Sequence, residues 1–145
     1  MRLMQITATA ITAVLVTAPL AGWAQERQGR GIELGHIEFI NNCAVCHGES
    51  ALGDGPLARL LTEGGQIIPN LTALKTNNRG AFPYERVFDV IDGRADVFAH
   101  GPRDMPVWGE TFKSEAPSNL TTDEAELLVH GRVHVLVQYL ASIQG

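Results

Sequence analysis

The chain has 145 residues, a length typical of one domain, and a formal net charge of −5 at pH 7. This acidic balance argues against nucleic acids and anionic lipid surfaces as ligands, because both are polyanions. It permits a protein partner that carries a basic patch.

The first 24 residues are predicted to be a secretory signal peptide. An arginine gives a positive start, and an apolar run follows over residues 6–20. Gly22 and Ala24 place small residues at the positions that a signal peptidase reads. The alternative is a retained anchor, but the apolar run is shorter than the ~20 residues that a spanning helix needs. We therefore predict cleavage after Ala24, export to the periplasm and no stable membrane insertion of the mature domain, residues 25–145.

The mature chain is predicted to begin with a loose polar segment over residues 25–31, followed by a helix over residues 32–43. Apolar residues and a histidine that recur at steps of three and four indicate this helix. They are Ile32, His36, Phe39, Ile40 and Cys43.

The run Cys43-Ala44-Val45-Cys46-His47 is the most specific motif of the chain. A C-x-x-C-H pattern is the one that attaches a c-type haem. Cys43 and Cys46 lie three residues apart on one helical turn, where each can form a thioether to a haem vinyl group. His47 then lies next to the macrocycle and is predicted to ligate the iron. The motif thus predicts one covalently bound haem c.

Other interpretations of the cysteine pair fit the sequence less well. An exported protein can hold such a pair as a disulfide or as a thioredoxin-like redox couple, so the export signal favours both these interpretations and haem attachment. Thioredoxin folds need alternating strands and helices, and the sequence shows no convincing strand pattern. A structural zinc site needs four ligands, but there is no second cysteine pair and no clear zinc spacing among the histidines.

The stretch after the motif is rich in glycine over residues 48–65. Residues 53–56, Gly-Asp-Gly-Pro, predict a turn, while the proline could instead open a short helix over residues 57–62. Residues 67–71 are predicted to be extended, because a residue that precedes a proline avoids the helical region.

A helix is predicted over residues 83–91, ended by Gly93, with Val87, Phe88 and Ile91 facing inward. Residues 94–119 contain three prolines and two glycines without a helical period. We expect a long loop there, and loops of that length in a compact domain are usually functional or disordered.

The last helix is predicted to start at a capping box formed by Thr121 and Glu124 and to run to about Ile143, with Gly131 as a weak point. One stripe of apolar residues is predicted to face the core. It consists of Val129, Val133, Leu136, Val137, Leu140 and Ile143.

Met105 is the predicted sixth ligand of the iron, because the other two methionines lie in the predicted signal peptide. Its loop is tethered between two helices and can fold over the opposite haem face, and Pro106 restricts Met105 to extended geometry. The alternative is a methionine of the core. A thioether is a usual partner of histidine in electron carriers.

The other histidines are weaker candidates. His100 is a rival sixth ligand that would give a bis-histidine site of lower potential, although a turn role is commoner for such a residue. His36 is expected at the surface or the helix edge. His130 and His134 are four residues apart on the last helix, a spacing that suits a surface metal, but a solvated pair is the favoured interpretation.

Residues around the ligands are expected to support them. Pro69 offers a backbone carbonyl to the second ring nitrogen of His47 and has no N–H to compete for it. Trp108 is predicted either to contact the haem edge or a propionate or to fill the core. Arg94 and Arg103 are candidates for propionate pairing, with solvation as the commoner alternative.

Taken together, these residues resemble the class I cytochromes c of the bacterial periplasmic branch. Gly35, Phe39 and Cys43 match the family's glycine–aromatic–cysteine ladder on the N-terminal helix, and Leu136 and Tyr139 match the C-terminal helix that crosses it. The resemblance implies that the glycine allows these two helices to approach closely.

The resemblance continues through the middle of the chain. Residues 69–71 are similar to the segment whose proline carbonyl accepts from the axial histidine, and residues 105–109 to the distal-methionine loop. Residues 53–56 resemble the turn that follows the haem motif. The stretch between His47 and Pro69 and the last helix are both longer than in small mitochondrial-type carriers.

The resemblance implies an all-α class I cytochrome c fold, with about three to five helices around one covalent haem and with the terminal helices crossing. It implies a periplasmic electron carrier with His47 and Met105 as axial ligands, no catalytic residues and redox proteins of unknown identity as partners. The alternative is a dedicated cytochrome subunit of a periplasmic dehydrogenase or reductase complex. A gas-binding or enzymatic haem is a third class, against which Met105 weighs.

Overall fold

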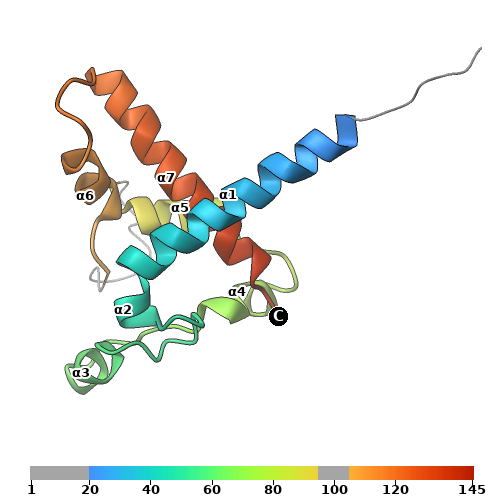
Figure 1. Ribbon diagram of the computed structural model, residues 1–145. Coiled ribbons are helices and arrows are strands. Elements are labelled where there is room, and N and C mark those ends of the chain that lie inside the picture. The colour runs from blue at the N-terminus through green and yellow to red at the C-terminus, as the bar shows by residue number, and fades with distance from the viewer. Residues whose placement is uncertain (1–19, 95–104) are drawn as a thin grey trace, which may run out of the picture.

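The computed structural model describes residues 20–94 and 105–145, with side chains from Gln25 onward. All regular elements in these ranges are helices, and no strand occurs among the described residues (Figure 1). The elements are α1 (Leu20–Asn42), α2 (Ala44–His47), α3 (Ala58–Glu63), the 3₁₀ helix η1 (Leu71–Ala73), α4 (Leu74–Asn77), α5 (Tyr84–Asp92), α6 (Trp108–Ser114) and α7 (Thr122–Ser142). The predicted all-α class is confirmed, whereas the expected number of three to five helices was too small.

The two long helices, α1 and α7, cross each other and form the centre of the molecule (Figure 1). Gly35 lies at the crossing, where a Cβ atom would come within 2.6 Å of the Val135 carbonyl carbon and 2.8 Å of the Tyr139 Cβ. Only a residue without a side chain permits this approach of the two backbones. The crossing of the N- and C-terminal helices that the sequence predicted is therefore present.

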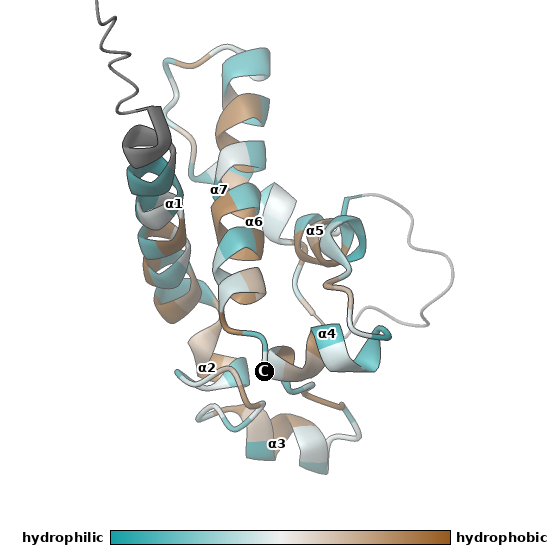
Figure 2. Ribbon diagram, turned by 90° about the vertical axis from the view of Figure 1, so that its right-hand side faces the viewer, coloured by the Kyte–Doolittle hydropathy of each residue, from teal (hydrophilic) through white to brown (hydrophobic). Residues whose placement is uncertain are grey.

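The core gathers along α7. Val129, Val133, Leu136, Val137 and Leu140 are buried as predicted, and Ile143 is half-buried. Phe39 from α1 and Phe112 from α6 are completely buried against this stripe. On α5, Val87 and Ile91 are buried and Phe88 is partly buried, while α5 and α6 both pack on α7 (Figure 2).

The start of α7 and the end of α5 follow the signals that the sequence predicted. Thr121 Oγ1 accepts from the Glu124 N–H at 3.3 Å, while a Glu124 carboxylate oxygen accepts from the Thr121 N–H at 2.8 Å. This capping box begins α7, which continues through Gly131 to Ser142. Gly93 ends α5 in the left-handed region at φ 68°. These caps are local, which explains why the sequence alone predicted them.

Three local expectations were wrong. Residues 25–31 belong to α1 and are not a loose segment, and Leu71, predicted to be extended, is the first residue of η1. The predicted loop over residues 94–119 contains α6, which has too few turns to show a helical period and is held by burial of Phe112. Ile40, one of the residues whose spacing predicted the first helix, is 38 % exposed.

Arg132 joins three elements beside the core. Its guanidinium donates to Glu38 of α1 at 2.9 Å and to Glu115, which follows α6, at 2.7 Å. The same group lies 3.8 Å from the centroid of the Phe112 ring. These contacts hold α6 against the α1–α7 pair.

Within the described ranges, no helix combines the length and the apolar character that crossing a membrane requires. α1 begins at Leu20 and passes through the predicted cleavage position after Ala24.

Candidate cofactor site

Cys43, Cys46 and His47 lie on a single helical turn that directly follows α1. Cys43 N–H still donates to Phe39 of α1 at 2.8 Å, and the Cys43 carbonyl accepts from the N–H groups of Cys46 at 3.1 Å and His47 at 2.9 Å. Both cysteines are half-buried free thiols. The turn therefore presents two thiols and one imidazole from adjacent positions of one short helix.

Burial, with smaller contributions from the nearby Glu38 and Cys46, raises the pKa of the Cys43 thiol to about 12. Cys43 is consequently a neutral thiol at physiological pH. Metal-binding and nucleophilic cysteines are thiolates, usually stabilised by positive surroundings. The environment of Cys43 is the opposite, which weakens the zinc and redox-couple interpretations of the pair.

His47 is buried and has one defined partner for its ring. The residue is only 8 % exposed, and its Nδ1 lies 3.4 Å from the Pro69 carbonyl oxygen. Burial lowers the pKa of His47, and the Pro69 carbonyl opposes this effect. A neutral imidazole that donates from Nδ1 to Pro69 keeps the lone pair of Nε2 for a ligand. The structure places the Pro69 carbonyl where the sequence predicted it.

The turn after the motif covers the end of α2. The last three backbone carbonyls of the motif accept hydrogen bonds from backbone N–H groups of residues 53–57, the glycine turn. The pairs are His47 with Gly53 at 2.8 Å, Cys46 with Gly55 at 3.2 Å, and Val45 with Leu57 at 2.9 Å. This arrangement satisfies carbonyls that a four-residue helix would otherwise leave without partners, and it fixes the motif to residues 53–57.

The segment that carries Pro69 is fixed on its C-terminal side. Leu71 N–H donates to the Ala51 carbonyl at 2.8 Å, and Gln144 Nε2 donates to the Leu71 carbonyl at 2.8 Å. The Asn70 side chain caps η1 by accepting from the Thr72 N–H at 2.9 Å. Pro69 is thus held between the glycine turn and the end of α7.

Met105 lies just before α6, where it is half-buried and packs against the hydrophobic core. The chain on its C-terminal side contacts the end of α5. A Cβ atom on Gly93 would lie 3.2 Å from the Val107 Cα, and one on Gly109 would lie 2.8 Å from the Asp92 carbonyl oxygen. These close approaches anchor the segment that presents the Met105 thioether.

Arg94 has a different role from the one expected. Its guanidinium pairs with Asp92 at 2.6 Å and with Glu126 at 2.6 Å, and its side chain is 20 % exposed. It is therefore not a solvated arginine, and its described partners are carboxylates of the chain itself. The Arg94 hydrogen bonds lower the pKa of Asp92, and they outweigh burial of the carboxylate, which acts in the opposite direction. His100 and Arg103, the other candidates of this loop, lie outside the described residues.

Trp108 is half-buried, packs against the core and lies 5.7 Å from Phe112 between ring centroids. This position agrees with the core-filling alternative. Contact of its indole with a cofactor remains a prediction.

The remaining histidines have separate partners. His36 is exposed and lies 5.0 Å from the Tyr139 ring. His130 stacks on Phe88 at 5.4 Å, whereas His134 hydrogen-bonds to Tyr84 at 2.6 Å and to Gln138 at 2.9 Å. Each member of the i, i+4 pair thus contacts other side chains. In the described part of the chain, no group of three or more His, Cys, Asp or Glu side chains is arranged to hold a metal ion.

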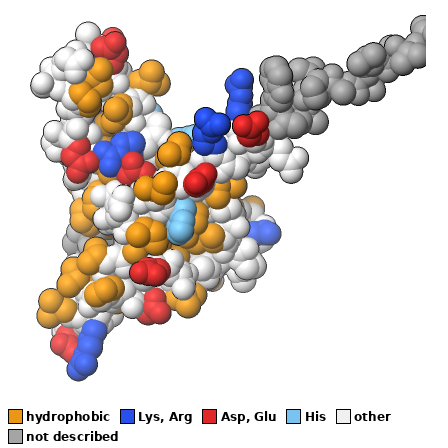
Figure 3. Space-filling model, viewed as in Figure 1, with side chains coloured by type: hydrophobic (Ala, Val, Ile, Leu, Met, Phe, Trp, Pro, Cys, Tyr) orange, Lys and Arg blue, Asp and Glu red, His pale blue; other side chains and the backbone are white. Residues whose placement is uncertain are grey.

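Apolar side chains are unusually exposed in the region around the motif. Among the residues that the structure describes, five of the ten exposed large hydrophobic residues fall between residues 45 and 67. They are Val45, Leu52, Leu57, Leu60 and Ile67. Figure 3 shows hydrophobic side chains at the end of the molecule where α2 and α3 lie. Such surface is suited to cover by a large apolar group.

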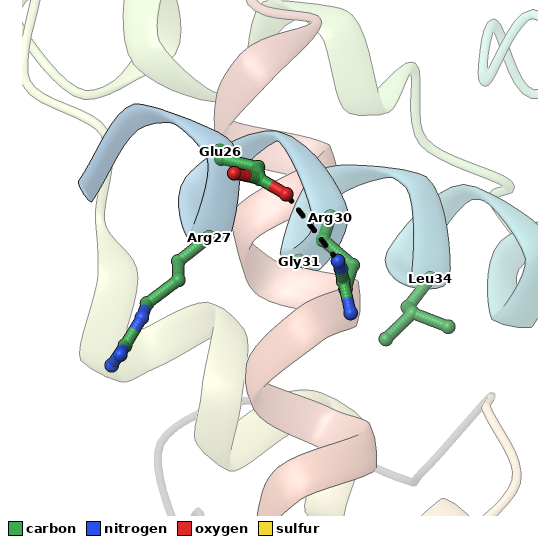
Figure 4. Close-up of a pocket in the computed structure, with 5 residues that line it drawn as sticks. All are labelled: Glu26, Arg27, Arg30, Gly31 and Leu34. Atoms are coloured by element: carbon green, nitrogen blue, oxygen red, sulfur yellow. Dashed lines mark ion pairs between the residues drawn. The ribbon is translucent and has the colours of Figure 1, made fainter. Parts of the chain in front are cut away.

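A surface depression lies on the earlier part of α1 and is lined by Glu26, Arg27, Arg30, Gly31 and Leu34 (Figure 4). Its one ion pair, between Glu26 and Arg30 at 3.6 Å, is strongly exposed. This depression contains no sulfur or imidazole group and is separate from the C-x-x-C-H turn.

No family model, curated protein or solved structure matches this chain. The interpretation of the site therefore depends on its own residues. The residues at the motif fit a haem c: two thiols on one turn, an imidazole held through Nδ1 and nearby exposed apolar surface. Met105 is half-buried just before α6, and its ligation of the iron stays a prediction. The sequence pointed to residues 53–56 and 105–109 through the resemblance, but it gave Gly53, Gly55 and Gly109 no contacts of their own; those appear only in the structure.

Proposed function

We propose that this chain is a periplasmic electron-transfer protein that carries one electron on a single covalently attached haem c. Cys43 and Cys46 would form the thioethers, and His47 and Met105 would be the axial ligands. The observation that carries the proposal is the buried His47, held through Nδ1 by the Pro69 carbonyl on the same turn as two thiols. The class I cytochrome c fold is part of this proposal.

The side chains support transfer and not catalysis. A bound haem supplies reversible one-electron chemistry, while the protein supplies ligands, orientation and exclusion of water. His47 is neutral because it is buried, and its orientation is fixed by one hydrogen bond. Two axial side chains would leave no iron position for a substrate, so we expect no catalytic base or nucleophile. The partners are redox proteins, for which the acidic chain suits a basic surface.

The direct test is the intact mass of the protein purified from a host that attaches haem c. We expect the mass of the chain without its first 24 residues plus one haem, and a visible spectrum typical of a low-spin c-type haem. An unmodified mass from this host would refute the proposal.

The Met105→Ala variant tests the sixth ligand. We expect the wild-type ferrous protein to bind CO slowly and the variant to bind it rapidly, because removal of the thioether opens one iron position. Rapid CO binding by the wild type would contradict ligation by Met105. Met105→His is the matched control, since a replacement ligand should restore slow binding.

A dedicated subunit of a redox complex is a second candidate, favoured by exposed apolar residues on α1. Leu34 and Ile37 are each 50 % exposed one turn apart, which suits a permanent protein interface. Size-exclusion chromatography and co-purification from native cells separate the two candidates. A stable stoichiometric complex would support the subunit, and a monomer would support the free carrier.

A further inference from the structure

Gly53 contacts both sides of the His47–Pro69 interaction. Its N–H donates to the backbone carbonyl of His47 at 2.8 Å. On its other side, a Cβ atom would lie 2.6 Å from the Ile68 carbonyl oxygen and 3.2 Å from the Pro69 carbonyl oxygen. The backbone of residue 53 therefore fills the space between the axial histidine's own chain and the segment that supplies its acceptor.

The acceptor segment has little freedom to move away from residue 53. Two hydrogen bonds, to Ala51 and from Gln144, fix the backbone of Leu71. If a larger side chain at position 53 displaces Ile68 and Pro69, Leu71 cannot move with them. The displacement is therefore confined to the segment before Leu71, which includes the Pro69 carbonyl.

The hydrogen bond itself tolerates little displacement. The distance from His47 Nδ1 to the Pro69 oxygen is 3.4 Å, at the long end for an N–H···O hydrogen bond. A shift of a few tenths of an ångström away from the ring would remove it, whereas a similar shift toward the ring would strengthen it.

We propose that Gly53 is a positioning residue that sets the Pro69 carbonyl against His47 Nδ1 and so controls how strongly His47 donates to a bound iron. This inference rests on the proposed function. A hydrogen bond at the remote ring nitrogen fixes the ring and raises its basicity as a ligand. Its loss weakens stabilisation of the ferric state and moves the reduction potential to more positive values.

The test compares Gly53→Ala with Gly80→Ala. Both glycines have positive φ, +84° and +86°, but a Cβ atom on Gly80 meets nothing within 4 Å. The two variants thus share the backbone strain of an L-residue, and only Gly53→Ala adds a collision with the Ile68–Pro69 backbone. The readouts are the reduction potential of the haem protein and hydrogen exchange of the His47 Nδ1–H, followed by NMR in the ferrous protein.

For Gly53→Ala we expect a more positive potential and Nδ1–H exchange about tenfold faster than in the wild type, the factor that corresponds to loss of one ordinary hydrogen bond. Gly80→Ala should leave both readouts at wild-type values. Equal values in the two variants would overturn the inference, and so would a more negative potential in Gly53→Ala.

A second variant covers the case in which Gly53→Ala does not fold. Gln144→Ala keeps the glycine but releases the tether on Leu71, and it should change both readouts in the same direction. Unchanged readouts in Gln144→Ala would then overturn the inference. If the wild type carries no haem, the proposed function fails, while Nδ1–H exchange in the haem-free protein still tests the role of Gly53.

Discussion

At the residue scale, Asp92 shows how the fold keeps a buried carboxylate charged. The residue is 7 % exposed at the end of α5 and receives Arg94 N–H groups at 2.6 Å and 2.8 Å. Arg94 also pairs with Glu126 of α7, and its guanidinium lies beside Gly109 of α6. This one ion cluster therefore connects three helices around the segment that bears Met105.

The Asp92→Asn variant should lower the free energy of unfolding by about 2 kcal/mol at pH 7, because it removes charged hydrogen bonds from a buried site. The Arg94 hydrogen bonds hold the folded pKa of Asp92 below its ordinary value of 3.8. The stability it contributes is therefore fully present above about pH 4 and is lost as the pH falls through the folded pKa. Urea unfolding between pH 7 and pH 2 measures this.

The difference between wild type and Asp92→Asn should shrink as the pH falls below 4. Asp89→Asn, on the exposed side of the same helix, serves as the control and should change stability little. If the difference stays constant across this pH range, the charge of the Asp92 carboxylate is not the source of the stabilisation.

At the element scale, the crossing of α1 and α7 decides where the C-x-x-C-H turn lies, because α2 continues directly from α1. The crossing depends on Gly35, whose missing side chain lets the backbone reach Val135. Gly131 lies on α7 itself, with nothing within 4 Å of its Cβ position. Both glycines lie inside long helices, but their surroundings differ. Substitution by alanine should therefore change the free energy of unfolding in opposite directions at the two positions.

We expect Gly35→Ala to destabilise the protein by about 2 kcal/mol, through collision with the backbone of α7. Gly131→Ala should instead stabilise it by about 1 kcal/mol, because alanine favours a helix interior. Thermal unfolding of both variants, followed by circular dichroism, shows whether each variant is less or more stable than the wild type. A neutral Gly35→Ala would show that the helices can separate at no cost.

The start of α7 gives a smaller and purely local effect. Thr121→Ala removes the side-chain acceptor of the Glu124 N–H and should lower the free energy of unfolding by about 1 kcal/mol. Thr122, the next residue, is exposed in the first turn and provides the matched control. Chemical unfolding should separate Thr121→Ala from Thr122→Ala, and equal effects would exclude a role for the cap.

At the scale of the whole molecule, the apolar core along α7 and the exposed apolar surface around α2 and α3 are distinct regions. Among the described residues, the core contains side chains that other parts of the chain bury fully, such as Phe39 and Phe112. The surface around the motif is not covered by the described chain, as Leu60 at 66 % and Ile67 at 81 % exposure show. We therefore expect the haem to stabilise one end of the molecule.

The Cys43→Ala, Cys46→Ala double variant, produced in a host that attaches haem c, should carry no covalent haem and should unfold at a lower temperature than the wild type. The physical reason is that apolar surface around the motif stays in water when the macrocycle is not held there. Wild-type protein from a host without the attachment machinery is the control and should melt like the variant. Equal melting temperatures for the variant and the haem-bearing wild type would argue against this coverage.

Much of this protein follows from local signals in the sequence. The C-x-x-C-H turn, the Gly93 stop of α5 and the Thr121 cap depend on residues within one or two turns of each other. For the same reason, the inward stripe of α7 was predicted correctly from its spacing. The sequence also predicted that the Pro69 carbonyl accepts from the His47 ring, and this carbonyl lies beside His47 in the structure.

The remaining features depend on contacts between distant parts of the chain. α6 has only seven residues, and burial of Phe112 and the Arg132 ion pairs hold it in place. Arg94 was a propionate candidate by sequence, but its guanidinium donates to Asp92 and Glu126 through all three of its nitrogens. The sequence by itself determined the helical class and the chemistry of the candidate ligands, because periodicity and motifs are local properties. Only the tertiary structure decided which glycines and which carboxylate lie beside them, because those partners meet through packing.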